Sequence, residues 1–379
     1  MLSNDQLYVL FLLRRIFCPE SNTEQVAADS PEDVKQIVLR SGVLLTVYKE
    51  LPEQLRAELK TLYAASIKQN IQQTYEGDRA LEALADAGLD CIGLKGWELR
   101  KLYPKQVARQ MADLDILVRP YEFRRIQAAM DKLGFRSGSE SSWKHDSFLK
   151  QGVHIEMHKR LTDDSGAIRD WEQRIWQRAI PTENARVFRM SPEDFYVFHF
   201  VHLHKDFMNG KLGLRRVLDT WLLQRQELDL SAARATLASF GMGTFHDRMV
   251  YLSRAALGEE ELDEDSEILL RHAFTYGIYG TDTSYKAGRI AAMSHGSLQS
   301  GKVRSAVSAV FLPYSRMKAQ FPVLNRWPVL LPLCWARRIV KFLRGDLARN
   351  RARLDYANIS ESDYREMKRF FAAGGVIRD

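Results

Sequence analysis

The chain has 379 residues, of which 45% are hydrophobic and 27% charged, and its net charge is +7. This composition is typical of a globular protein with a large core, and it excludes an intrinsically disordered chain. The three cysteines, Cys18, Cys91 and Cys334, show no pairing pattern, which excludes a disulfide framework. No apolar run approaches the length of a membrane span.

The first 88 residues predict helices. The apolar stretch within residues 1–17 is interrupted by charged side chains, so we expect an amphipathic helix rather than a signal peptide, and a cytoplasmic protein. Apolar residues then recur at helical spacing between Leu55 and Leu84. Gly88 follows this pattern, where a glycine typically ends a helix.

From Leu89 onward the apolar runs become short. We predict strands at Leu89–Leu94 and Asp115–Val118, and a hairpin of Asp146–Lys150 and Val153–His158 around the turn Gln151-Gly152. Helices are expected between these strands, at Trp97–Tyr103 and Tyr121–Leu133.

The remainder of the chain predicts helices and loops. Ser191 has the position of an N-cap, with Pro192 first in the helix and Asp194 third. Three prolines exclude one regular helix over Phe321–Pro332. We therefore predict an α+β fold with a small mixed β-sheet core over residues 89–185. A helical region precedes it (1–88), and a helical C-terminal domain with a basic, proline-containing segment follows it (186–379).

Positive charge is concentrated near the C-terminus. Between Arg316 and Arg353 ten lysines and arginines stand against one acid, Asp346, so this window carries +9 and the rest of the chain −2. Such a segment could contact a membrane surface peripherally, bind an acidic partner, or form a solvated face. The nearly neutral remainder, without a recognition motif, argues against a nucleic-acid partner.

Two carboxylates, Asp113 and Asp115, stand one residue apart at the start of the second predicted strand. Residues i and i+2 of a strand point to the same side, so both carboxylates should leave one face of the sheet. Their mutual repulsion decreases when a divalent cation lies between them. The pattern therefore predicts a site for Mg²⁺ (or Mn²⁺).

Two further motifs point to the same chemistry. Lys95-Gly96 follows the first predicted strand, where backbone N–H groups and the lysine can face a phosphate. His154, Glu156 and His158 alternate along a strand, and Glu156 would complete the acidic trio that two-metal phosphoryl or nucleotidyl transfer requires. The same three residues could bind Zn²⁺, but the Asp-x-Asp pair would then have no explanation.

Leu94-Lys95-Gly96, then Arg109 before Asp113-Leu114-Asp115, and then Glu156-Met157-His158 resemble the nucleotidyltransferase superfamily of the DNA-polymerase-beta type. Within it, the chain is most similar to the bacterial family called uncharacterised nucleotidyltransferase. Trp97 departs from the superfamily pattern, which usually has a second small residue there. The resemblance is specific over about residues 80–160 and extends loosely to the run 215–219, Arg-Arg-Val-Leu-Asp.

The resemblance implies roles for individual residues. Asp113 and Asp115 would hold both metal ions and Glu156 the catalytic one, which makes these three the expected catalytic residues. Other residues are expected to contact the nucleotide (Lys95, Gly96, Arg109, His158, Arg215, Arg216). The implied reaction is transfer of a nucleoside monophosphate from an NTP, with ATP among the candidates, to an unidentified hydroxyl or phosphate acceptor. That acceptor could be a small molecule, a sugar phosphate, a peptide or a protein.

Other hypotheses stay open at this point. Asp-x-Asp with a divalent cation also binds the nucleotide sugar in many glycosyltransferases, although the Lys95 turn and Glu156 favour nucleotidyl transfer. The chain could also be a non-catalytic nucleotide-binding module, although the full acidic trio is present. His199 and His202, three residues apart on a predicted helix, are interpreted as core or surface histidines rather than as part of the site.

Overall fold

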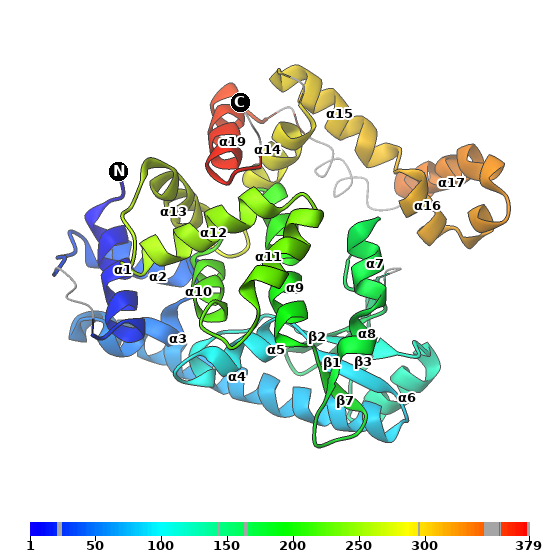
Figure 1. Ribbon diagram of the computed structural model, residues 1–379, viewed down its shortest axis with the longest axis horizontal. Helices are drawn as coiled ribbons and strands as arrows, with labels where there is room; N and C mark the ends of the chain where they lie inside the picture. Colours follow the sequence, from blue (N-terminus) through cyan, green and yellow to red (C-terminus); the bar gives the residue numbers. More distant parts are fainter. Residues whose placement is uncertain are drawn as a thin grey trace.

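The computed structural model describes residues 1–20, 25–141, 144–162, 166–294, 296–344, 356 and 358–376. Its fold is α+β as expected, with one seven-stranded mixed sheet that helices precede and follow along the chain. In Figure 1, helix α4 runs along one side of the sheet and the helices of the C-terminal half lie on the other. No helix in the described part of the chain has the length and apolar character needed to cross a membrane.

The N-terminal region is helical, as predicted. Its helices are α1 (Asn4–Phe17), α2 (Pro31–Arg40), α3 (Leu44–Val47) and α4 (Glu53–Asp86), with a short 3₁₀ turn η1 (Tyr48–Glu50) before α4. Ser3 begins α1 with a capping box, in which its hydroxyl and the Gln6 side chain satisfy backbone N–H groups. Gly88 adopts a φ of +75° just after α4, which confirms the prediction that this glycine ends the helix.

The sheet has the order β3-β4-β5-β2-β1-β7-β6. Its strands are β1 (Asp90–Gly93), β2 (Leu114–Arg119), β3 (Arg136–Ser141), β4 (His145–Lys150), β5 (Val153–His158), β6 (Ile180–Pro181) and β7 (Val187–Arg189). The four predicted strands are confirmed as β1, β2, β4 and β5. Strands β3, β6 and β7 were not predicted, because they are short or lack alternating apolar residues.

The sheet extends to Arg189, beyond the expected end of the core at residue 185, since β7 pairs with β1. Helix α6 (Phe123–Lys132) lies where it was predicted. The expected helix over Trp97–Tyr103 is shorter, formed by α5 (Gly96–Leu99) and the 3₁₀ turn η2 (Arg100–Leu102); another 3₁₀ turn, η3 (Gln106–Ala108), follows.

The two faces of the sheet belong to different cores. Ile116 and Ile155 pack with the C-terminal part of α4 and with α6, whereas Ile92 and Leu117 join a larger core built with the C-terminal helices. Because side chains alternate along a strand, Asp115 lies on the same face as Leu117. The carboxylate-bearing face therefore points toward the C-terminal helices.

Helices α7 (Ala167–Gln173) and α8 (Ile175–Arg178) precede β6. After β7, the described residues form only helices and turns. The α-helices there are α9 (Pro192–Met208), α10 (Leu214–Leu223), α11 (Leu230–Ser239), α12 (Gly243–Ala256), α13 (Glu264–Tyr276), α14 (Asp282–Met293), α15 (Leu298–Val310), α16 (Tyr314–Gln320), α17 (Leu331–Arg344) and α19 (Glu361–Ala373). The predicted cap of α9 is confirmed, because the Ser191 hydroxyl accepts a hydrogen bond from the Asp194 N–H. The proline-containing stretch 321–332 forms two 3₁₀ turns, η4 (Pro322–Asn325) and η5 (Pro328–Leu330), rather than one helix.

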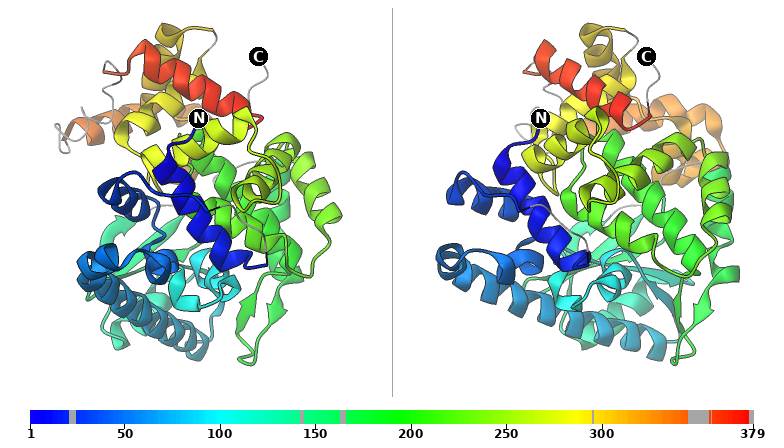
Figure 2. Two further views of the ribbon diagram at one scale, coloured as in Figure 1. Left: turned by 90° about the vertical axis from the view of Figure 1, so that its left-hand side faces the viewer. Right: turned by 60° about the vertical axis from the view of Figure 1, so that its left-hand side comes forward.

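The first helices pack against the C-terminal half. Figure 2 shows α1 lying beside helices of that half. Arg14 of α1 donates hydrogen bonds to the carbonyl oxygens of Ala255 and Ala256, and the rings of Phe17 and Trp221 meet edge to face. Residues of both segments share the larger core. Together they cover the face of the sheet that carries Asp115.

Candidate functional site

Lys95 occupies the turn between β1 and α5. Its φ of +45° is rarely adopted by residues other than glycine, and such strain is often found at functional sites. The backbone N–H of Leu94 donates to the carbonyl oxygen of Asp115, which holds the turn against β2. The Lys95 ammonium donates to Asp115 Oδ1 at 2.6 Å. The turn thus places a cation directly above the Asp-x-Asp segment.

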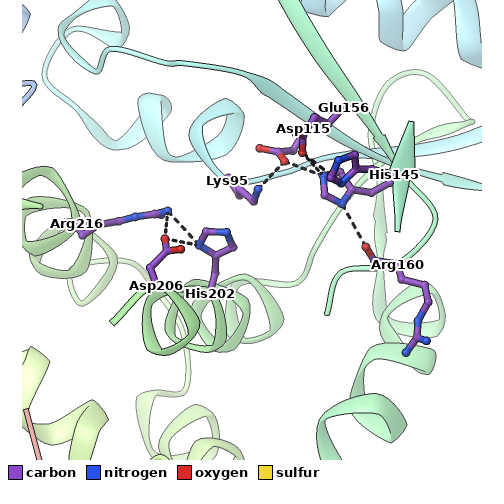
Figure 3. Close-up of polar contacts among 9 residues, drawn as sticks. Lys95, Asp115, His145, Glu156, Arg160, His202, Asp206 and Arg216 are labelled. Carbon is purple, nitrogen blue, oxygen red and sulfur yellow. Dashed lines mark hydrogen bonds and ion pairs between the residues drawn. The ribbon is translucent and has the colours of Figure 1, made fainter. Parts of the chain in front are cut away.

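Strand β5 runs parallel to β2, and the register sets Glu156 beside Asp115. His158 connects the two carboxylates, because its Nε2 lies 2.7 Å from Asp115 Oδ1 and 3.2 Å from Glu156 Oε2. Its other ring nitrogen, Nδ1, lies 3.2 Å from the carbonyl oxygen of Arg160. The structure therefore brings together Lys95, Asp115, Glu156 and His158, all of which the sequence had indicated. Figure 3 shows Lys95, Asp115 and Glu156 of this cluster.

The carboxylates of this cluster are unequally compensated. Burial would raise the pKa of Asp115, but Lys95 and His158 outweigh it and hold this pKa well below its usual range. The pKa of Asp113, by contrast, is raised by burial and by the negative charge of Asp115. The hydrogen bonds of His158 with Asp115 and Glu156 raise the pKa of His158 despite its burial. Asp113 is thus the carboxylate whose charge the neighbouring side chains neutralise least, and a cation would stabilise it.

Two groups of side chains in the described part of the chain could hold a metal ion. Asp113, His154 and Glu156 offer ligand atoms within 4.8 Å of one another, and so do His145, Glu156 and His158. Glu156 belongs to both groups. Asp115 belongs to neither, and its Oδ1 accepts from Lys95 and lies against His158.

A second wall of the site comes from α9 and α10. Arg216 Nη2 lies 3.1 Å from Asp206 Oδ2 and 3.0 Å from His202 Nδ1. Figure 3 shows these three side chains across from Lys95. Burial lowers the pKa of His202 to about 4, so this histidine is neutral at neutral pH. The site therefore has one cationic group on the sheet side, Lys95, and another on the helix side, Arg216.

Arg109 and Asp219 form a buried ion pair. Arg109 donates from Nε and Nη2 to the two carboxylate oxygens at 2.8 and 2.7 Å, and the Tyr103 hydroxyl donates to the same carboxylate at 3.0 Å. Nearby, Arg215 donates to the carbonyl oxygen of Gln110 at 2.7 Å. These contacts attach α10 to the segment before β2. A phosphate contact of Arg109 stays a prediction, since only 4% of this residue is exposed.

Trp97 has a structural explanation. A Cβ atom added at Gly77 of α4 or at Gly93 of β1 would lie 2.3 Å from the Trp97 ring, so both glycines make room for it. The Arg100 guanidinium lies over the ring, 4.1 Å from its centroid. The indole thus fills the junction between α4 and β1. Gly96 is similarly constrained, because a Cβ there would lie 2.7 Å from Arg109 Nη1.

The two histidines of α9 differ. His199 is a core residue, as interpreted from the sequence: it is 3% exposed, its Nε2 lies 2.9 Å from Thr220 Oγ1, and burial lowers its pKa to about 3. His202 instead faces the site, and Asp206 with it. Nothing in the local pattern distinguishes these two histidines, because only the packing of α9 on the sheet decides which one faces the site.

Sequence reasoning also missed His145, although a signal was present. The hairpin turn at Gln151-Gly152 sets the register of β4 and β5, and this register pairs His145 with His158. Their ring centroids lie 5.3 Å apart. Counting outward from the predicted turn would have found this residue.

The comparisons with known proteins agree with this geometry. A family model described as "Uncharacterised nucleotidyltransferase" matches residues 32–258. The match covers more than half of the chain and contains all the site residues described above. No curated protein matches the chain, and no solved structure does.

Proposed function

Since the chain belongs to the uncharacterised nucleotidyltransferase family, we propose that it moves a nucleoside monophosphate from an NTP, such as ATP, to a hydroxyl or phosphate acceptor, with Mg²⁺ or Mn²⁺ as cofactor. We also propose that it is related to the DNA-polymerase-beta-like superfamily. The observation that carries the proposal is the cluster of Asp113, Asp115 and Glu156 around Lys95. These residues come from motifs that are far apart in the sequence. The pairing of β2 with β5 sets Glu156 beside Asp115, and Lys95 forms an ion pair with Asp115.

The side chains present fit a divalent cation. Asp113 and Glu156 supply the carboxylate oxygens that Mg²⁺ prefers, and His154 adds an imidazole that suits Mn²⁺ better than Mg²⁺. We propose that Asp113 and Glu156 hold the cation and that Asp115 contributes on the same face of the sheet. When bound, such a cation neutralises charge on the phosphate oxygens and on the leaving pyrophosphate.

The remaining residues would bind and orient the substrates. Lys95 and the backbone at Gly96 are proposed to contact the phosphates from the sheet side, and Arg216 from the helix side. Arg215 would position α10, through its hydrogen bond to the Gln110 carbonyl oxygen. His158 would position the carboxylates of Asp115 and Glu156. Despite burial, the hydrogen bond with His158 lowers the pKa of Glu156. Glu156 is therefore ionised at neutral pH, and we propose that it accepts the proton of an acceptor hydroxyl.

The test is calorimetric titration with each NTP and with UDP- and GDP-sugars, with and without Mg²⁺. We expect an NTP to bind only with the cation, and Asp113→Asn to abolish this cation-dependent binding while the fold is retained. Asp131→Asn, an exposed aspartate on α6, is the control and should bind like the wild type. Binding of a nucleotide sugar alone would favour glycosyl transfer, and retained cation-dependent binding in Asp113→Asn would remove Asp113 from the site.

A further inference from the structure

One stretch outside the family match has an extreme charge composition. Residues 283–345 contain eleven lysines and arginines and no aspartate or glutamate. The whole chain carries only +7, so all other residues together sum to −4. The family match ends at residue 258, before this stretch begins. This concentration of charge therefore calls for an explanation separate from the nucleotide site.

Part of this stretch forms a small unit of its own. Helix α16, the turns η4 and η5, and α17 pack on one another around Met317, Leu324 and Cys334. This cluster is distinct from the two larger cores of the protein. Figure 1 shows α15 leading from α14 to this unit. We call it the basic unit (residues 314–344).

Large apolar side chains of the basic unit are exposed to solvent. The exposed fractions are 56% for Trp327, 80% for Val329 and 66% for Leu333. On α17, Leu333, Arg337 and Val340 follow at intervals of four and three residues, so they lie on one face of the helix. All three are exposed. Apolar and cationic side chains thus share one surface.

Several exposed cations of the basic unit have no anionic partner among the residues that the structure describes. Lys318, Arg326 and Arg337 are exposed, and none of them forms an ion pair with another residue that the structure describes. Some arginines elsewhere are paired; Arg248, for example, pairs with Asp263. A partner of this surface must therefore be anionic and must also accept apolar side chains.

We propose that the basic unit docks the protein onto the surface of an anionic phospholipid membrane. Lipid phosphates would neutralise the lysines and arginines, each contributing favourably near a charged surface. Trp327, Val329 and Leu333 would enter the boundary between headgroups and acyl chains, where tryptophan is preferred. A nucleic acid would match the charge, but its backbone offers no apolar layer for valine and leucine. Charge and apolar exposure together thus favour lipid.

The test is co-sedimentation of the full chain with vesicles of phosphatidylcholine, alone or mixed with phosphatidylglycerol. We expect binding to the mixed vesicles only, and weaker binding at high salt. The charge variant Lys318→Glu/Arg326→Glu/Arg337→Glu and the apolar variant Trp327→Ser/Val329→Ser/Leu333→Ser should each bind about tenfold more weakly or worse.

Matched controls lie on α4 and α6. Lys60→Glu/Lys68→Glu/Lys132→Glu makes the same charge change at exposed lysines, and Leu62→Ser/Ile71→Ser/Tyr75→Ser removes the same number of exposed apolar side chains. Both controls should bind vesicles like the wild type.

Three results would overturn the proposal. The first is a wild-type chain that binds neither kind of vesicle. The second is an apolar variant that binds as well as the wild type, because the contact would then be electrostatic adsorption alone. The third is tight binding of an RNA oligonucleotide, lost in the charge variant, without vesicle binding, which would assign the surface to nucleic acid.

Discussion

The buried ion pair between Arg109 and Asp219 allows a quantitative test of how α10 is attached to the core. In Asp219→Ala the Arg109 guanidinium stays buried and loses both of its charge-assisted hydrogen bonds. Breaking one partner of a buried pair typically costs about 3–5 kcal/mol of stability, because the remaining charge is uncompensated. The pKa of Asp219 gives an independent scale. Arg109 outweighs the effect of burial and lowers the pKa of Asp219 from 3.8 to about 2. This shift corresponds to a contribution of about 2–3 kcal/mol to the free energy of unfolding at neutral pH.

The assay is urea unfolding followed by circular dichroism and tryptophan fluorescence. We expect Asp219→Ala to lower the free energy of unfolding by several kcal/mol. The double variant Arg109→Met/Asp219→Leu should cost much less than the sum of the single changes, because it leaves no buried charge. Glu361→Gln removes the exposed pair with Arg365 and serves as the control, with little expected effect.

Two results would refute this reasoning: a loss below about 1 kcal/mol in Asp219→Ala, as for a surface pair, or a double variant as unstable as the sum of the single changes. The double variant also separates the two roles of Arg109. If Arg109 contacts phosphate, the double variant should lose NTP affinity although its stability is recovered. If Arg109 only attaches α10, NTP affinity should be retained.

Three further predictions follow from the buried side chains. Burial lowers the pKa of His199 to about 3 and that of His272 to about 4, so both are neutral in the folded protein, while the unfolded chain takes up protons below about pH 6.5. Stability should therefore fall by about 2 kcal/mol per histidine between pH 7 and pH 5 in urea unfolding, and a stability independent of pH over this range would contradict the assignment. Lys95→Ala should weaken NTP binding in calorimetry by about tenfold or more, an effect larger than its effect on stability; unchanged affinity would exclude a phosphate contact. Gly77→Ala should destabilise the protein by about 1–3 kcal/mol, because its Cβ would meet the Trp97 ring, and thermal unfolding unchanged from the wild type would show that the ring can move.

Local patterns determined the positions of the elements that carry the site. Short apolar runs predicted β1 and β2, and the turn Gln151-Gly152 predicted the hairpin of β4 and β5. Within these elements, alternation along a strand predicted one face for Asp113 and Asp115, and one face for Glu156 and His158. Strand β3 escaped prediction because its sequence, Arg-Ser-Gly-Ser-Glu-Ser, has no apolar alternation, and it is held at the sheet edge by pairing with β4.

The sequence by itself determined these elements and the acidic motif, because strand and turn preferences depend on residues a few positions apart. Only the tertiary structure decided which distant side chains meet. The parallel pairing of β2 with β5 sets Glu156 beside Asp115, and the packing of α9 turns His202 rather than His199 toward Lys95. Such contacts depend on the register of strands and the orientation of helices around a shared core, which no local pattern encodes.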